Sequence, residues 1–186
     1  AATGNEGFAG HHFRGTATAG LMQTVEFSTI SNLSSFYLTL WKNFVDSMFF
    51  ELIGPSGEST GVIRPENAFT FATVDNTEVI IVYGEPTEYS EAQEVFFQLT
   101  GRDFAIPAGI WRLNIYPSVI VDGVYDIWLP VIEMVTADTA FRLPDPGITL
   151  TLPSTAKNVI SVGGYNSLIN AMTDFSGRGY TRSIKY

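Results

Sequence analysis

The chain has 186 residues, of which 45% are hydrophobic and 16% are charged, and its formal net charge at pH 7 is -9. This length and composition suit one ordinary domain, or one domain with appendages, and they exclude a disordered chain. An acidic surface repels phosphate backbones and anionic lipid, so neither nucleic acid nor a membrane is an expected partner. The absence of cysteine excludes disulfides, thiolate catalysis and cysteine-ligated zinc within this chain.

From about Phe13 the chain consists of short segments rich in β-branched and aromatic residues, with turn residues about every ten positions. Residues 36–41 alternate between an apolar face and a second face that includes Trp41, which predicts a strand. A strand over 48–53 is followed by the strong turn signal GPSG at 54–57. Further strands are predicted at 61–63, 68–74, 78–83, 94–100, 109–116 and 123–129. Asp122-Gly123 fits a tight hairpin.

These eight or so strands, with no helical periodicity between them, predict a mainly β fold with an antiparallel sandwich or barrel. A jelly roll is the expected version, because eight strands in two facing sheets suit this length. Near Thr149 the pattern of residues changes. Residues 158–162 form an almost wholly apolar stretch, typical of a strand that is buried on both faces of a parallel α/β sheet. The segment LPDPG at 143–147 is a plausible seam between the two regions.

The two ends resemble the subtilisin-like serine proteases, or subtilases. Residues 3–7 (TGNEG) match a turn that follows a buried strand in that family, and residues 153–164 (PSTAKNVISVGG) match a later stretch. Residues 175–179 (FSGRG) match the family's Phe-Ser-x-x-Gly loop. The residues of these motifs and their order are most similar to those of the clostridial group that includes the Csp-type spore-germination proteases. These proteases carry a β-sandwich insert between the motifs.

The resemblance implies three parts: a catalytic-domain piece at 1–12, a β-sandwich insert at 13–148, and a second catalytic-domain piece at 149–186. It implies that residues 1–5 and 158–164 are neighbouring strands of a parallel sheet. Asn5 matches the family's oxyanion-hole asparagine, whose amide donates to the negative oxygen that develops during acyl transfer. The alternative for Asn5 is a turn cap.

In the family the catalytic aspartate and histidine precede this asparagine, and the nucleophilic serine follows in Gly-Thr-Ser, which does not occur here. We therefore expect a fragment of a serine endopeptidase that is inactive alone and uses no cofactor or metal. Its expected partners are a polypeptide substrate in the parent, the rest of the catalytic domain, and the propeptide as a further candidate. Dimerisation through exposed edges is left open, and the resemblance is compatible with a secreted or spore-associated protein.

Several other residues are candidates for a functional role. His11 and His12 are the only histidines, and a structural role where the chain enters the insert is the expected one. Ser176 is expected to be a loop residue rather than a nucleophile. An acidic stretch could bind calcium but is expected to be a solvated loop; it contains Glu85, Glu88, Glu91 and Glu94. The tryptophans could form a sugar-binding platform, which would make the chain a carbohydrate- or protein-binding module; they are Trp41, Trp111 and Trp128.

Overall fold

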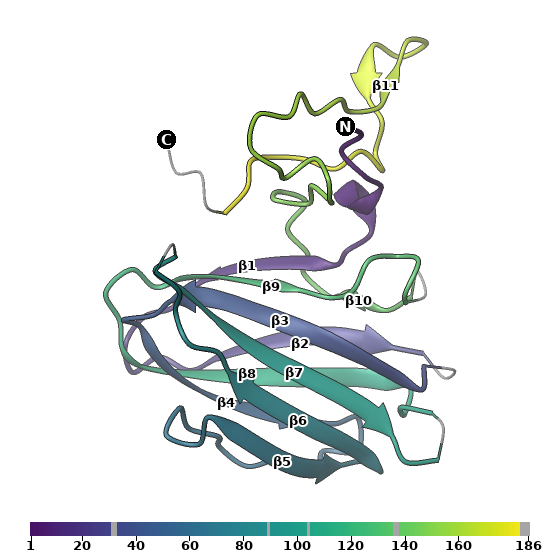
Figure 1. Cartoon of the computed structure of the whole chain (residues 1–186). Coiled ribbons are helices and arrows are strands. Elements are labelled where there is room, and N and C mark those ends of the chain that lie inside the picture. Colours follow the sequence, from purple (N-terminus) through teal and green to yellow (C-terminus); the bar gives the residue numbers. More distant parts are fainter. Residues whose placement is uncertain (31–32, 89, 104, 136–137, 183–186) are drawn as a thin grey trace.

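The computed structural model describes residues 1–30, 33–88, 90–103, 105–135 and 138–182. It consists mainly of antiparallel strands, with a short 3₁₀ helix, η1 (Glu6–Phe8), near the N-terminus (Figure 1). The strands are β1 (His12–Thr16), β2 (Gln23–Thr29), β3 (Ser35–Asn43), β4 (Ser47–Ile53), β5 (Phe69–Val74), β6 (Thr77–Tyr83), β7 (Ala92–Gly101), β8 (Gly109–Val119), β9 (Val124–Trp128), β10 (Ala140–Phe141), β11 (Tyr165–Asn166) and β12 (Ala171–Met172). Within the described ranges, no helix is long and apolar enough to cross a membrane.

The strands form two large sheets and one small hairpin. One sheet has six strands in the order β1-β9-β3-β7-β6-β5, and the other has four in the order β10-β2-β8-β4. Strands β11 and β12 pair only with each other, in the region that Figure 1 shows above the two sheets together with the N-terminus. The predicted mainly β, antiparallel fold is therefore confirmed.

One apolar core joins the two large sheets. Phe27 of β2 meets Phe36 of β3 edge to face at 6.1 Å between ring centroids, and Phe50 of β4 meets Phe97 of β7 at 5.7 Å. Trp111 of β8 is completely buried among them. Each such buried side chain contributes about 1.5–3 kcal/mol through removal of apolar surface from water, so this core holds the sheets face to face.

Most of the predicted strands are present, because their alternation places one face in this core. The predicted segment at 61–63 is not a strand; its neighbourhood contributes only isolated bridges to β4, at Ile53–Ser59 and Phe50–Ile63. Strands β1 and β2 lie in segments for which no separate strand is predicted from the sequence.

The predicted hairpin at Asp122-Gly123 is wrong. Strands β8 and β9, which this turn connects, belong to different sheets and do not pair. The carboxylate of buried Asp46 instead accepts hydrogen bonds from the backbone N–H groups of residues 121–123, at 2.6, 3.1 and 2.8 Å. The tight hairpin of this fold lies at Asp75-Asn76, between β5 and β6, where both residues have positive φ, at 48° and 56°.

The two ends of the chain lie side by side. Ala2 and Val162 form a parallel bridge, in which Thr3 N–H donates to Val162 O at 3.1 Å and Val162 N–H donates to Ala1 O at 2.8 Å. The two predicted segments therefore lie side by side in parallel, but neither forms a strand and a single bridge connects them. The prediction of a strand buried on both faces at 158–162 is wrong for this chain, because Ile160 is 84% exposed and Val162 is 63% exposed.

Candidate functional site

The turn that carries Asn5 is held between two distant segments. Gly4 O accepts from Gly177 N–H at 3.1 Å, and Gly7 N–H donates to Phe175 O at 3.0 Å. Gly4 has φ 87°, and a Cβ added there would lie 2.1 Å from the Thr151 hydroxyl oxygen. Glycine is therefore required at this position by both backbone conformation and close packing.

Asn5 itself lies at the exposed side of this turn. It occupies the N-cap position of η1, with φ -114° and ψ 15°, yet its side chain makes no capping hydrogen bond. An asparagine that served only as a cap would accept from an N–H of the first helical turn. The geometry leaves the Asn5 amide available for another acceptor.

Ser176 is completely buried beneath this turn. Its hydroxyl oxygen lies 3.0 Å from the Thr3 hydroxyl oxygen and accepts from Gly164 N–H at 3.0 Å. It therefore ties the two end segments together and is inaccessible to a substrate.

Glu6 follows Asn5 and faces inward. One carboxylate oxygen lies 2.7 Å from Nδ1 of His11, and the other accepts from Ile132 N–H at 3.0 Å. Nε2 of His11 is buried and has no hydrogen-bond partner within the described ranges. This pair joins the Asn5 turn to the segment that follows β9.

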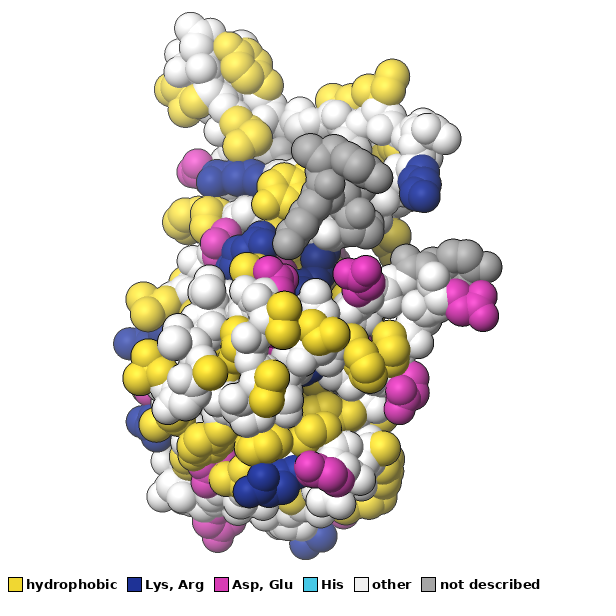
Figure 2. Space-filling model, turned by 90° about the vertical axis from the view of Figure 1, so that its left-hand side faces the viewer, with side chains coloured by type: hydrophobic (Ala, Val, Ile, Leu, Met, Phe, Trp, Pro, Cys, Tyr) yellow, Lys and Arg dark blue, Asp and Glu magenta, His cyan; other side chains and the backbone are white. Residues whose placement is uncertain are grey.

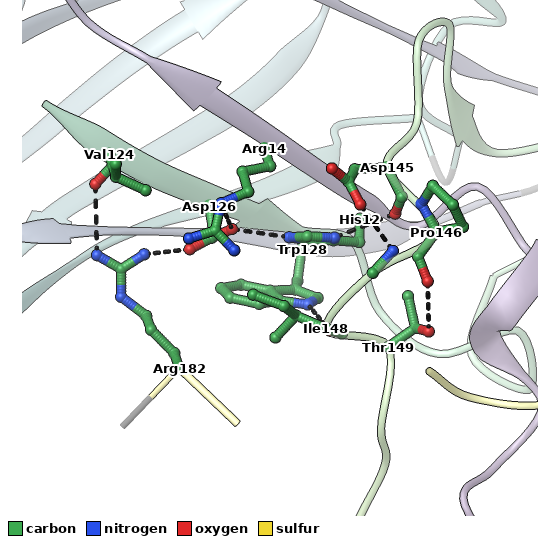
Figure 3. A network of polar contacts seen from close by, with 11 residues as sticks. His12, Arg14, Val124, Asp126, Trp128, Asp145, Pro146, Ile148, Thr149 and Arg182 are labelled. Atoms are coloured by element: carbon green, nitrogen blue, oxygen red, sulfur yellow. Dashed lines mark hydrogen bonds and ion pairs between the residues drawn. The ribbon is translucent and has the colours of Figure 1, made fainter. Parts of the chain in front are cut away.

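His12 takes a different partner, as shown in Figure 3. Its Nε2 lies 3.0 Å from an Asp126 carboxylate oxygen and its Nδ1 lies 3.1 Å from Asp145 O, so both ring nitrogens face acceptors. The ring also stacks on Trp128 at 4.8 Å between centroids. Neither histidine hydrogen-bonds a serine in the part of the chain that the structure describes, so no Ser/His pair forms here.

Asp126 is fully buried and is the centre of this network. Arg182, from the C-terminal segment, donates to its carboxylate, and Arg14 Nε lies 3.7 Å away. Burial alone would raise the pKa of Asp126, but the hydrogen bond from His12 and the charges of Arg182 and Arg14 together hold that pKa below its ordinary value. The network connects β1 and β9 of the sandwich with the C-terminal segment.

A second buried charge, Lys42, lies at the end of β3. Its ammonium group donates to Asn43 O at 3.2 Å and to Asp46 O. Burial lowers the pKa of Lys42 to about 8, although the nearby Asp46 carboxylate opposes this. These two hydrogen bonds stabilise the turn after β3. Among the described residues, no serine or threonine side chain is hydrogen-bonded to the Lys42 ammonium group.

The acidic stretch does not converge on one point. Glu88 and Glu91 line an open groove beside the turn at residues 43–45, whereas Glu94 lies in β7 opposite Trp41. Among the described residues, no group of three or more His, Asp or Glu side chains is arranged to hold a metal ion.

The three tryptophans do not form one platform. Trp111 is in the core and donates to the Thr29 hydroxyl at 3.1 Å, and Trp128 stacks on His12 and donates to Ile148 O at 3.2 Å. Trp41 and Trp128 are both half-buried. The hypothesis of a platform made of all three tryptophans is therefore wrong, because the strand alternation turns Trp111 inward.

No model of a protein family matches the sequence, and no curated protein matches it. Among solved structures, the CspB protease of Clostridium perfringens is similar, with a TM-score of 0.88 and 29% sequence identity. The match covers 97% of this chain and 37% of that protease. The chain is therefore similar over almost its whole length to a little more than a third of a Csp-type protease.

Proposed function

We propose that this chain is a part of a subtilisin-like serine endopeptidase and supplies its oxyanion-hole asparagine, Asn5. The observation that carries the proposal is the similarity of 97% of the chain to a segment of the CspB protease. In the intact enzyme, an Asp/His/Ser triad from other parts of the polypeptide hydrolyses peptide bonds, and the Asn5 amide stabilises the developing oxyanion.

The geometry of the Asn5 turn supports this role. The turn is fixed by backbone bonds to residues 175–177, while the side chain is exposed and makes no cap. A donor that is already positioned needs no reorganisation when charge develops on the substrate, which is the physical basis of oxyanion stabilisation. Asn5 is therefore the residue of this chain that contacts the reacting atoms.

By itself the chain is hydrolytically inert under this proposal. Acyl transfer requires a nucleophile, a base and an oxyanion donor within hydrogen-bonding reach of one another. Both histidines are buried against carboxylates, and Ser176 is buried under the turn. The chain thus supplies one of the three components.

The sandwich is assigned to the jelly-roll class and to an insert spanning 13–148. Support comes from the strand order: β1-β9-β3-β7 lie in one sheet, whereas β2, β8 and β4 lie in the other. The connections from β1 to β2, β3 to β4 and β8 to β9 each change sheet, as in two interlocked Greek keys. The β5–β6 hairpin extends the first sheet.

The insert acts as a clamp on the rest of the catalytic domain or on its propeptide, and adds kinetic stability. The Arg182–Asp126 contact supports this role because it fastens the C-terminal segment to the sandwich. Apolar side chains gathered at the tip at the top of Figure 2 supply a surface for the partner. Leu168, in the β11–β12 connection, is 92% exposed.

The experiment compares this chain with the longer polypeptide that contains it, each treated with an active-site-directed fluorophosphonate. We expect stoichiometric labelling of the longer polypeptide and none of the chain alone. In the longer polypeptide, Asn5→Ala is expected to lower kcat, whereas the matched Asn67→Ala at an exposed loop leaves it unchanged. Labelling of a serine in the chain alone, or full activity of Asn5→Ala, would contradict the proposal.

A carbohydrate- or protein-binding sandwich without protease activity is the second candidate. It is favoured by Tyr37 and Phe96, which stack at 5.6 Å between ring centroids on the outer face of the six-stranded sheet. Glycan-array binding that is lost in Tyr37→Ala, together with a longer polypeptide that lacks a triad, would establish this candidate in place of the first.

A further inference from the structure

Four strands form the outer edges of the two sheets, and three of these edges are protected. At β1, His12 O accepts from Asp145 N–H at 2.8 Å. At β4, Phe50 exchanges two backbone hydrogen bonds with Ile63, at 3.1 and 2.7 Å, and β10 has only two residues. Strand β5 is the fourth edge, and it pairs only with β6 among the described residues.

The open positions of β5 follow from its pairing with β6. Tyr83 N–H donates to Ala68 O at 3.0 Å, which makes Ala68 and Tyr83 a hydrogen-bonded pair. Hydrogen-bonded and non-hydrogen-bonded pairs alternate along antiparallel strands, so Thr70 and Ala72 also bond β6. The N–H and C=O groups of Phe69, Phe71 and Thr73 consequently point away from the sheet.

Nothing in β5 blocks a further strand. Natural edge strands are usually protected by charged residues, proline or a bulge, yet β5 (FTFATV) has no charge and no proline and pairs with β6 in unbroken register. Two of its side chains, Phe69 and Phe71, are 55% and 66% exposed and meet edge to face at 4.9 Å. An uncharged, regular edge with exposed aromatic rings is suited to strand addition.

We propose that two copies of this chain associate through β5, antiparallel, about a twofold axis that passes beside Phe71. In this register Phe71 lies opposite Phe71 of the second copy, and Phe69 lies opposite Thr73. All three open positions then pair with open positions, which gives about six backbone hydrogen bonds, two for each pair.

A second copy is the occupant because the edge is its own complement. When a second β5 runs antiparallel to the first, its open backbone groups lie opposite those of the first strand. The side chains of opposite residues then lie on the same face of the joined sheet. Strand β5 itself carries no charge, and of the carboxylates near it Glu78 pairs with Arg102 at 3.3 Å and Asp75 accepts from Ser56.

The outer face strengthens the pairing. The register of the sheet places Tyr37, Gln98, Ile80 and Phe71 in one row across β3, β7, β6 and β5. The twofold axis joins this row to its copy, so Phe71 lies between Ile80 of its own sheet and Phe71 of the second copy. Figure 1 shows β5 at the end of the molecule opposite the N-terminus and β11, so this association leaves the proposed catalytic-domain contacts free.

The test is sedimentation equilibrium of the whole chain over a range of concentrations. We expect a monomer–dimer equilibrium that Phe71→Lys weakens by about tenfold or more, because like charges then face each other across the axis. The matched control Phe44→Lys changes an exposed aromatic residue outside β5 in the same way and should leave the dimer intact.

The register has its own test. A mixture of Phe71→Lys and Phe71→Glu should form a mixed dimer, although neither variant dimerises well alone, because only position 71 opposite itself brings the two charges together. A monomeric wild type, a dimer unaffected by Phe71→Lys, or a dimer abolished by Leu168→Lys would overturn the proposal. In the last case the association would use the exposed tip of the end segments and not β5.

Discussion

The hydroxyl oxygens of Thr3 and Ser176 lie 3.0 Å apart and buried, although 173 positions separate them in the sequence. The Ser176 hydroxyl also accepts from Gly164 N–H, so three segments meet at one side chain. The side chain of Ser176 thus holds segments from both ends of the chain together.

Ser176→Ala should loosen this end structure selectively. It leaves the buried Thr3 hydroxyl and the half-buried Gly164 N–H without this partner, and an unsatisfied buried group costs about 1–3 kcal/mol. Hydrogen exchange should therefore accelerate at residues 1–7 and 160–177 and remain slow in the core strands β3, β7 and β9. Ser167→Ala, at an exposed position of the hairpin, is the control. Equal acceleration throughout the chain would show that the ends and the sandwich unfold as one unit.

Asn5→Ala separates the two roles considered for this residue. Because the side chain makes no capping bond, the variant of this chain should unfold at the same urea concentration as the wild type. A true N-cap would lose about 0.5–2 kcal/mol. If Asn5 is the oxyanion donor proposed above, the same change in the longer polypeptide should reduce kcat by about 10²–10³, the loss found for an oxyanion-hole donor of subtilisin, with little change in KM. A destabilised chain with normal kcat would identify Asn5 as a cap.

Asp126→Asn should be strongly destabilising. The change leaves His12 and two arginines without their shared anion, and removal of one partner from a buried ion pair costs about 3–5 kcal/mol. Asp174→Asn, at an exposed carboxylate, should have little effect. Urea unfolding monitored by tryptophan fluorescence at neutral pH provides the measurement.

The same carboxylate predicts part of the acid dependence. Its pKa in the folded chain is below the ordinary value of 3.8, so the folded state binds the proton less readily than the unfolded state. Its stabilising effect is fully present above that ordinary value and is lost as the pH falls through the lower, folded value. The free-energy difference between wild type and Asp126→Asn should accordingly shrink below about pH 4. A difference that is constant with pH would exclude an ionised Asp126.

Lys42 should produce a rise of stability with pH in the alkaline range as well. Its pKa falls from 10.5 in the unfolded chain to about 8 in the folded chain, so between these values the unfolded state holds more protons and stability rises with pH. Wild type should therefore gain stability relative to Lys42→Met over this interval, and Lys157→Met, at an exposed position, is the matched control. Measurements are best kept below pH 10, because burial raises the pKa of Tyr125 to about 12 and tyrosine ionisation then favours unfolding.

A shortened chain of residues 6–149 should fold cooperatively. Every member of the apolar core lies between Ala17 and Phe141, and this shortened chain keeps the Glu6–His11 pair. Near-ultraviolet circular dichroism and fluorescence should report coincident urea transitions. Non-coincident transitions, or loss of the near-ultraviolet signal, would show that the removed ends of the chain are needed for the sandwich to form.

The sequence predicted the fold class because a period of two is a local property. Alternation in residues 36–41 placed Phe36, Leu38 and Leu40 on one face, and all three are in the core. It did not predict how the strands are arranged, since a turn signal reports a change of direction but not the destination. Asp122-Gly123 carried a hairpin signal, yet the next strand enters the other sheet under the control of the Asp46 carboxylate.

The candidate site, like the fold, could be predicted only in part from the sequence. The order of the two end motifs led to Asn5 and to the parallel neighbours at Ala2 and Val162, because each motif is a contiguous run of residues. The network of His12, Asp126 and Arg182 could not be predicted from a short motif. His12 is 114 positions from Asp126, and Arg182 is 56 positions from it. By itself the sequence determined the period, the turns and the chemistry carried by short motifs. The tertiary structure decided which charges share a buried site and which edge stays open, because burial and strand pairing depend on contacts between residues far apart in the chain.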